Sequence, residues 1–143
     1  MRIMAIDFGD ARTGISVSDI SGTLTGEAWV IHERNLSKAA DTIASEAVLR
    51  QVGKIVVGYP KNMNGTIGPR AEKSEQLAQC IRENCDIEVL LWDERMTTMS
   101  AHRILSDTGK HGKKRKKTVD AVAASLILES YLAFLAQQER HNS

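Results

Sequence analysis

Hydrophobic and polar positions follow a strand-like period in the first third of the chain and a helical period afterwards. Residues 2 to 7 form a near-continuous apolar run, which is typical of a central strand buried on both faces. Residues 13 to 19 alternate Ile15 and Val17 with serines, and a third strand is expected over residues 24 to 31. Connections this short join antiparallel neighbours, so the pattern predicts a three-strand meander.

Helices and strands alternate from residue 37 onwards. Apolar residues recur at helical spacing from Ala39 to Val48, and Gly53 is expected to end this helix just after Gln51. The later elements are expected as a strand over 54–59, a helix over 69–84, a strand over 88–92, a helix over 98–106 and a last helix over 118–137. The order βββαβαβαα predicts an α/β fold: a mixed five-strand sheet, with three antiparallel strands followed by parallel strands, and helices on both faces.

Length and composition predict one compact domain over residues 1–143. The chain has only 10 Gly and 2 Pro, and no Pro/Gly/Ser-rich linker or internal repeat divides it. No apolar stretch before Asp7 is long enough for a signal peptide, and no run of about 18 apolar residues lacks a charge, so a cytoplasmic protein is expected. Cys80 and Cys85 lack zinc-site spacing and are expected to be reduced structural thiols.

Positive charge is concentrated in one part of the chain. The formal net charge is +1, but 6 of the 19 basic residues fall within residues 110–117, here called the basic segment. A solvated charge run and a flexible arm that holds a phosphate backbone both fit this pattern. Aromatic residues make up only 4% of the chain, so backbone charge rather than base stacking is expected to dominate any nucleic-acid binding.

Three acidic residues occupy positions where a buried core normally excludes charge. Asp7 ends the first strand, Glu94 follows the strand over 88–92, and Asp120 opens the last apolar helix. Unpaired buried carboxylates cost several kcal/mol, so converging acids usually share a cation or a basic partner. Carboxylates suit Mg²⁺ or Mn²⁺, and two such ions about 3.5 to 4 Å apart assist phosphodiester hydrolysis. Asp7, Glu94 and Asp120 are therefore predicted as catalytic residues and metal ligands, with Asp7 bridging two ions.

Each acid also has a simpler structural explanation. Asp7 could form a turn beside Gly9, and Asp120 could favour the positive end of its helix. Glu94 competes with its neighbour Asp93, because adjacent residues of a strand point to opposite faces and only one of them can face the site. The residues alone leave this choice open.

Four motifs, in this order, resemble those of the YqgF family of bacterial proteins. They are Asp7-Phe8-Gly9-Asp10-Ala11-Arg12-Thr13-Gly14, Val56-Val57-Gly58-Tyr59-Pro60 with Asn64-Gly65, Asp93-Glu94-Arg95-Met96-Thr97-Thr98, and Val119-Asp120-Ala121-Val122-Ala123-Ala124. The resemblance implies a ribonuclease H-like fold and favours Glu94 over Asp93. It implies a nuclease that processes the 5′ end of precursor 16S ribosomal RNA, with resolution of Holliday junctions in branched DNA as the alternative.

Basic and amide side chains are expected to contact the nucleic acid, either precursor ribosomal RNA or branched DNA. The loop after the strand over 54–59 leaves the edge where open α/β sheets place ligands. The predicted contacts are Lys61, Asn64, Arg70, Arg95, Lys113, Lys114, Arg115, Lys116 and Lys117. Gly58, Gly65 and Gly68 are assigned to tight turns, and His32 to the surface.

Two other functions fit parts of the sequence. Asp7-Phe8-Gly9 followed by Gly14 also resembles the phosphate-binding hairpin of the actin and sugar-kinase superfamily, but those proteins hold ATP between two lobes and this length supplies one. A non-catalytic nucleic-acid-binding module with the same fold is the other alternative. No membrane association is expected.

Overall fold

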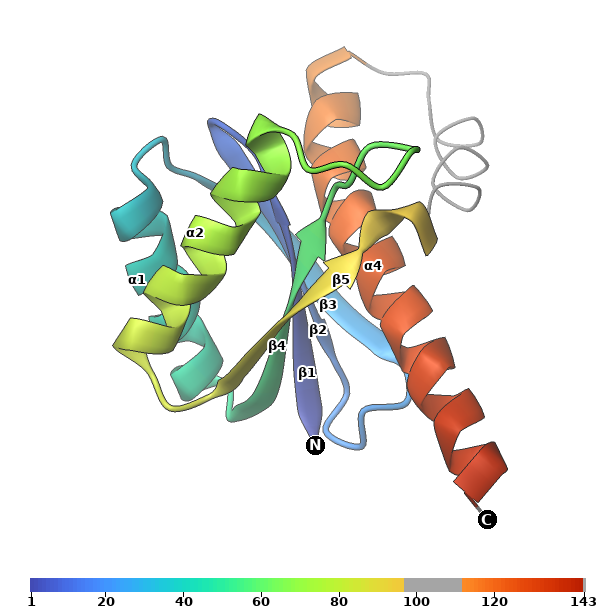
Figure 1. Ribbon diagram of the computed structural model, residues 1–143. Coiled ribbons are helices and arrows are strands. Elements are labelled where there is room, and N and C mark those ends of the chain that lie inside the picture. The colour runs from blue at the N-terminus through green and yellow to red at the C-terminus, as the bar shows by residue number, and fades with distance from the viewer. Residues whose placement is uncertain (97–111, 143) are drawn as a thin grey trace.

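A computed structural model describes residues 1–96 and 112–142, with side chains over 1–96 and 121–140. Its elements are β1 (Arg2–Phe8), β2 (Arg12–Ser18), β3 (Thr25–His32), α1 (Leu36–Leu49), β4 (Val52–Tyr59), α2 (Pro69–Asn84), β5 (Glu88–Asp93), the 3₁₀ turn η1 (Glu94–Met96) and α4 (Gly112–Asn142) (Figure 1). The helix expected over 98–106 lies outside the described residues.

One five-stranded sheet has the order β3-β2-β1-β4-β5, which confirms the predicted central position of the first strand. β1 pairs antiparallel with β2 and parallel with β4, and β4 pairs parallel with β5. The mixed sheet is thus the predicted one. Because β1, β4 and β5 run in the same direction, their carboxyl ends meet at one edge of the sheet.

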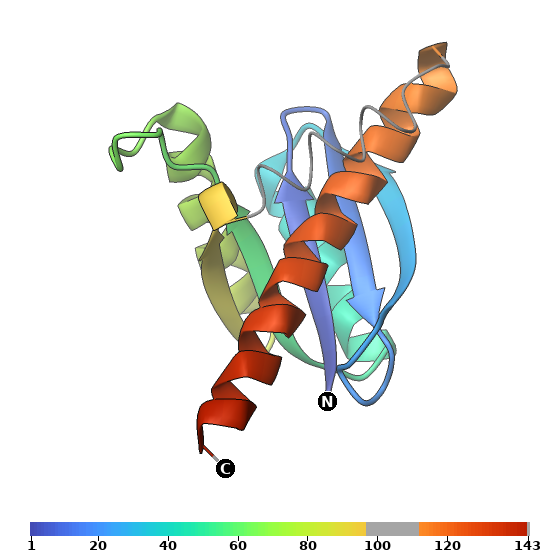
Figure 2. The same ribbon diagram turned by 90° about the vertical axis from the view of Figure 1, so that its right-hand side faces the viewer.

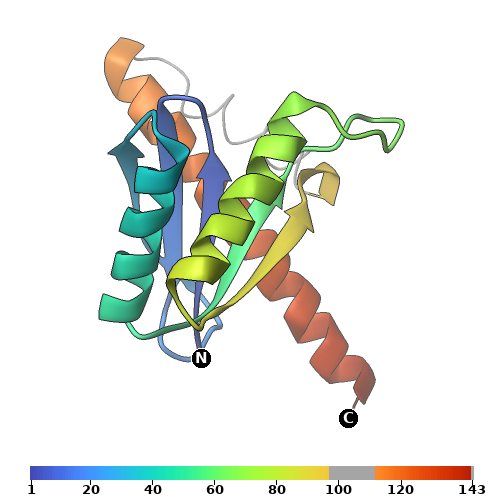
Figure 3. The same cartoon turned by 60° about the vertical axis from the view of Figure 1, so that its left-hand side comes forward.

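Helices cover both faces of the sheet, as the sequence predicts. α1 and α2 pack on one face, and α4 crosses the other (Figures 2 and 3). Two clusters of buried residues follow from this arrangement: Met4 and Ile6 of β1 belong to the cluster under α1 and α2, whereas Ile3 and Ala5 belong to the cluster under α4. The strand therefore alternates between two apolar layers, which explains its continuous apolar run.

The end of α1 differs from the prediction. The helix ends at Leu49, and Gln51 takes a left-handed φ of 58° before β4 begins at Val52. Gly53 lies inside β4, where a Cβ would come within 2.5 Å of the Met1 Cγ. The glycine therefore makes room for the amino terminus, and its assignment as a helix stop was wrong.

The last helix begins earlier than predicted, at Gly112 instead of Thr118, and it continues past Gln137 to Asn142. The backbone from Lys113 to Lys117 is therefore helical and not a loop, in keeping with the high helix propensity of lysine and arginine. By length and composition alone, the stretch Ala121–Arg140 is long and apolar enough to cross a membrane. Its apolar face covers the sheet, because Ala124 and Leu128 are fully buried there.

Candidate active site

Asp7 and Glu94 lie together at the carboxyl edge of the sheet, as the sequence predicts. Their side chains share a hydrogen bond, which two carboxyl groups form only when one of them carries a proton. Burial raises the pKa of Glu94 from 4.5 to about 7, and the negative charge of Asp7 acts in the same direction. The pair is thus a strongly perturbed acidic site on a rigid sheet.

Strand alternation explains why these two acids meet. Ile3 and Ala5 face α4, so Asp7, two residues further along β1, is on the same face. On β5, Trp92 packs on the α4 side, and Glu94 follows it by two residues. The intervening strand, β4, has Gly58 opposite Trp92.

Gly58 permits the contact across β4. A Cβ at this position would lie 2.6 Å from the Glu94 Oε1 and 2.7 Å from the Ile127 Cδ1 of α4. The missing side chain therefore leaves the space that the Glu94 carboxyl group occupies. Our assignment of Gly58 to a tight turn was wrong, and its place in a strand next to two acid-bearing strands was the signal for this role.

Asp93 has a different partner. Its carboxylate accepts hydrogen bonds from the Arg95 backbone N–H at 3.0 Å and from Arg95 Nη2 at 2.6 Å, within the η1 turn. These bonds with Arg95 lower the pKa of Asp93, so this carboxylate is ionised and already paired. The structure therefore places Glu94, and not Asp93, beside Asp7.

Asp120 lies on α4, and its side chain is outside those described. The helix position is seven residues before Ile127, which contacts the space above Gly58. Seven residues make about two helical turns, so the two positions share a face of the helix. Among the side chains over 1–96 and 121–140, no three His, Cys, Asp or Glu residues gather into a metal site, and the acid pair supplies two of the three predicted ligands.

The residues near the pair that are predicted to contact nucleic acid differ in their exposure and in their neighbours. Arg70 is exposed, and its positive charge opposes the rise in the Glu94 pKa. Lys61 Nζ lies 5.5 Å from the centroid of the Tyr59 ring. Asn64 Oδ1 accepts hydrogen bonds from the Thr66 N–H and hydroxyl, so this side chain shapes its own loop.

The other predicted contacts are Arg95 and the basic residues of α4. Arg95 is held by Asp93, with its Nη1 3.8 Å from a Cβ built on Gly65. The side chains of Lys113, Lys114, Arg115, Lys116 and Lys117 lie outside those described, although their backbone is part of α4.

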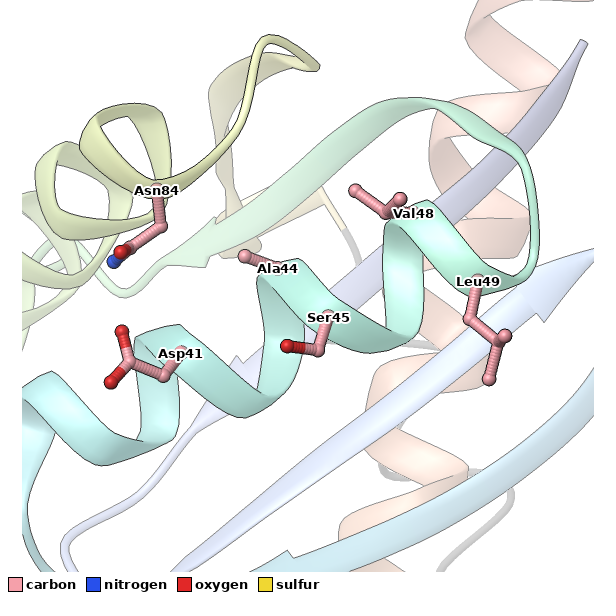
Figure 4. A pocket seen from close by; sticks show the side chains of 6 residues that line it. All are labelled: Asp41, Ala44, Ser45, Val48, Leu49 and Asn84. Carbon is pink, nitrogen blue, oxygen red and sulfur yellow. The ribbon is translucent and has the colours of Figure 1, made fainter.

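A hollow between α1 and α2 offers a contrast to this site. It is lined by Asp41, Ala44, Ser45, Val48, Leu49 and Asn84 (Figure 4). These residues come from the carboxyl-terminal part of α2 and the middle and end of α1, toward the edge of the sheet opposite the acid pair. Among these lining residues Asp41 is the one carboxylate and none is basic, so the hollow lacks the paired acids on which the predicted chemistry depends.

Proteins with similar sequences match this chain over nearly its full length. The model of the family described as "RuvX: Holliday junction resolvase" matches residues 1–134. A protein of Desulfitobacterium hafniense named "Putative pre-16S rRNA nuclease" is 42% identical over 99% of both chains. A protein of the same name from Bacillus cytotoxicus is 45% identical over 92% of this chain and 98% of its own.

The fold is shared with a solved resolvase. RuvC of T. thermophilus in complex with a Holliday junction substrate superposes with a TM-score of 0.60 at 13% identity, covering 94% of this chain and 96% of that one. This likeness confirms the predicted ribonuclease H-like fold. The family model and the two relatives settle the family itself: this chain belongs to the RuvX family, the YqgF family that its four motifs resemble.

Proposed function

We propose that this protein is a metal-dependent nuclease that hydrolyses phosphodiester bonds and processes the 5′ end of precursor 16S ribosomal RNA. The observation that carries the proposal is the Asp7–Glu94 pair, in which burial and mutual repulsion raise the pKa of Glu94 to about 7. Two carboxyl groups forced together in this way are a common arrangement at catalytic sites. The names of the relatives supply the choice of RNA substrate.

The acid pair fits a divalent cation. Its oxygen atoms are the ligand type that Mg²⁺ and Mn²⁺ prefer, and a cation would take the place of the proton that the pair now shares. We assign Asp7, Glu94 and Asp120 as the residues that would hold two such ions. Bound there, the ions would stabilise the negative charge that develops on the phosphoryl group during hydrolysis.

The other residues of the edge orient the substrate in this proposal. Arg70 stands near Glu94 and can pair with a phosphate next to the cleaved bond. Lys61 reaches the same edge from the end of β4, where its charge also lowers the pKa of Asp93. Asn64 and Arg95 build and brace the loop over this edge, and their contacts to substrate stay a prediction.

The basic segment is also assigned to substrate binding, because its positive charges can pair with substrate phosphates. Its backbone from Gly112 onwards is helical and leads directly into Asp120, so the charges from Lys113 to Lys117 belong to the helix that carries the third proposed ligand. Alanine at Lys113, Lys114, Arg115, Lys116 and Lys117 should weaken binding. The slope of log affinity against log salt should fall by about 0.7 to 0.9 for each phosphate interaction that the substitutions remove. Unchanged affinity and slope would count against this assignment.

The test of the function is cleavage by the purified protein. Labelled precursor 16S RNA and a labelled four-way DNA junction are incubated with Mg²⁺ or Mn²⁺. Asp7→Asn, Glu94→Gln and Asp120→Asn should each slow cleavage by about 100-fold or more, because loss of several kcal/mol of charge stabilisation corresponds to such factors.

Asp41→Asn is the matched control, since Asp41 is an exposed acid on α1 remote from the pair. It should cleave at the unaltered rate. The proposal is wrong if the protein leaves both substrates intact with either metal, or if the three acid variants cut as fast as the control.

Resolution of Holliday junctions is the second candidate. Two observations favour it: the description of the matching family, and the fold shared with RuvC on its junction substrate. The same assay separates the two functions, because a resolvase would cut the junction at symmetric positions and leave the RNA intact.

A further inference from the structure

A groove separates the edge strand β3 from α4, on the face that carries the acid pair. It is lined by Ala28, Trp29, Val30 and His32 of β3 and by Ala121, Val122 and Ser125 of α4. The Trp29 ring itself packs on the other face of the sheet, against the cluster under α1 and α2. His32 also lines a second hollow, together with Ala11, Arg12, Glu33 and Arg34. The two hollows therefore share His32, the last residue of β3.

The lining of the two hollows is rich in hydrogen-bond donors. Arg12 lies directly opposite His32 in the pairing of β2 with β3, and Arg34 follows two residues later. The carboxylate of Glu33, in the same lining, accepts the backbone N–H of Asn35 at 3.0 Å, so it is engaged at the start of α1. Within the described part of the chain, His32 and Arg34 are exposed and form no ion pair.

The groove and the acid pair lie on the same face of the sheet, on either side of α4. Asp7 pairs with Gly14 of β2, and Gly14 pairs with Val30 of β3, inside the groove lining. Because neighbouring strands lie about 4.8 Å apart, β3 is roughly 10 Å from β1 across the sheet. α4 packs on β2 between them, where Ser125 Oγ donates a hydrogen bond to Ser16 Oγ at 3.2 Å, so a bound strand would reach His32 past the turn between β1 and β2.

The helical side of the groove continues into the basic segment. Ala121 directly follows Asp120, and the first turns of α4 extend past the turn between β1 and β2 (Figure 2). The groove is therefore bordered by the donors Arg12, His32 and Arg34 near the end of β3 and by the helix of the basic segment on the other side, with the acid pair beyond that helix.

We propose that this groove holds the nucleic-acid strand that leaves the acid pair, with its phosphates contacting Arg12, His32 and Arg34. The proposal rests on the proposed nuclease function and adds a binding path to it. Side-chain donors over a small apolar floor match a phosphate backbone with its sugars, and they recognise no base sequence. The path should therefore contribute equally to binding of different sequences.

The test measures equilibrium binding in an Asp7→Asn background, so that the labelled RNA and junction stay intact. Adding His32→Ala and Arg34→Ala together should weaken binding by about tenfold at roughly 0.15 M salt. It should also lower the salt slope by about 0.7 to 0.9, as expected when the one phosphate interaction of a full positive charge, that of Arg34, is removed. Arg34→Lys, which keeps the charge, should recover most of its part of the loss.

Arg140→Ala is the matched control. Arg140 is an exposed arginine 20 residues after Asp120 on the same helix, about 30 Å along its axis. Its removal should leave both affinity and slope unchanged, which separates a local contact from a general effect of net charge.

A second measurement locates the contact on the substrate. Single neutral methylphosphonate linkages are scanned on both sides of the cleaved bond. A linkage a few nucleotides away should weaken binding to the Asp7→Asn protein but not to the variant that also carries Arg34→Ala, because the two changes remove the same interaction.

These experiments separate a failure of the groove proposal from a failure of the proposed nuclease function. If the Asp7→Asn protein binds nucleic acid and the His32→Ala, Arg34→Ala changes alter neither affinity nor slope, the groove proposal is overturned and the nuclease function stands. If the unaltered protein neither binds nor cleaves RNA or junction, both are overturned.

Discussion

At the scale of single residues, the candidate site depends on an absent side chain. Glu94 comes from the end of β5 and Asp7 from β1, and the two strands are separated by β4. Their carboxyl groups meet because Gly58 has no side chain in the space that the Glu94 carboxyl group occupies. A glycine in a strand interior usually weakens the strand, so its presence here indicates a close approach by another group.

Gly58→Ala should therefore damage stability and activity together. The added methyl group would meet Glu94 Oε1 at 2.6 Å and Ile127 Cδ1 at 2.7 Å, and overpacking of this kind costs about 1 to 3 kcal/mol. Urea unfolding measures the loss, and cleavage should fall because Glu94 is displaced. Gly68→Ala is the control, since its methyl group would meet Asn62 at an ordinary 3.7 Å. Equal effects of the two changes would contradict the role of Gly58.

The pKa of Glu94 predicts how stability depends on pH in the metal-free protein. The folded pKa of about 7 lies above the ordinary value of 4.5. Between these values the folded state binds more protons than the unfolded state, so the free energy of unfolding falls as pH rises. The whole effect amounts to at most about 3 kcal/mol, because one pKa unit corresponds to about 1.4 kcal/mol.

Glu94→Gln removes this effect. In the presence of a chelator, the variant should match the unaltered protein at about pH 4.5 and be more stable by up to about 3 kcal/mol at about pH 8, as measured by urea unfolding. Added Mg²⁺ at the higher pH should stabilise the unaltered protein more than the variant. A stability difference that is the same at both pH values would refute the buried position of this carboxyl group.

At the scale of elements, the η1 turn directs neighbouring acids to different tasks. The Asp93 carboxylate accepts hydrogen bonds from both the side chain and the backbone N–H of Arg95. These bonds close the turn and fix the position of Glu94, which lies between the two residues. The partly exposed Asp93–Arg95 pair itself contributes little to stability, as surface ion pairs usually do. The pair matters because it holds the η1 turn and thereby positions Glu94.

Asp93→Asn tests this division of roles. Asparagine keeps an oxygen that can accept the Arg95 backbone N–H, so cleavage should fall by less than about tenfold. Glu94→Gln, the same acid-to-amide change one residue later, should cost about 100-fold or more. The ratio of the two cleavage rates is the measurement, and a larger loss at Asp93 would contradict the assignment of the catalytic role to Glu94.

Elements with a clear hydrophobic period were predictable from the sequence, and those governed by local contacts were not. The apolar run of β1 indicated its central place correctly, because only a strand covered on both faces needs such a run. The predicted start of α4 is too late, because a run of charged residues resembles a loop although lysine and arginine favour helices. Gly53 and Gly58 were misassigned because their partners, Met1 and Glu94, are distant in sequence.

The site itself was predictable only in part. Asp7 and Glu94 were found as charges at the ends of apolar strands, and the structure brings them together. The choice between Asp93 and Glu94 needed the family resemblance, because alternation shows that the two side chains point to opposite faces but not which face turns toward the site. The groove between β3 and α4 had no signal in the sequence, since it forms only when an early strand and the last helix pack together.

At the scale of the whole molecule, the site is part of the packing between the sheet and α4. Ile127 of α4 is buried in the cluster with Ala5 and Val56, and its Cδ1 limits the space above Gly58. The same layer therefore supports the sheet and fixes the room available to Glu94. α1 and α2 pack on the other face, so changes in their cluster should leave this space unaffected.

The double variant Gly58→Ala, Ile127→Val makes this coupling measurable. Valine lacks the Cδ1 that the new methyl group would meet at 2.7 Å, so the combined loss of stability should be smaller than the sum of the single losses by about 0.5 to 1.5 kcal/mol. Cleavage should stay low, because the clash with Glu94 Oε1 remains. Ile43→Val, in the buried cluster under α1, is the control and should add to Gly58→Ala without coupling. Recovery of cleavage in the double variant would show that Ile127, and not Glu94, is the group that Gly58 accommodates.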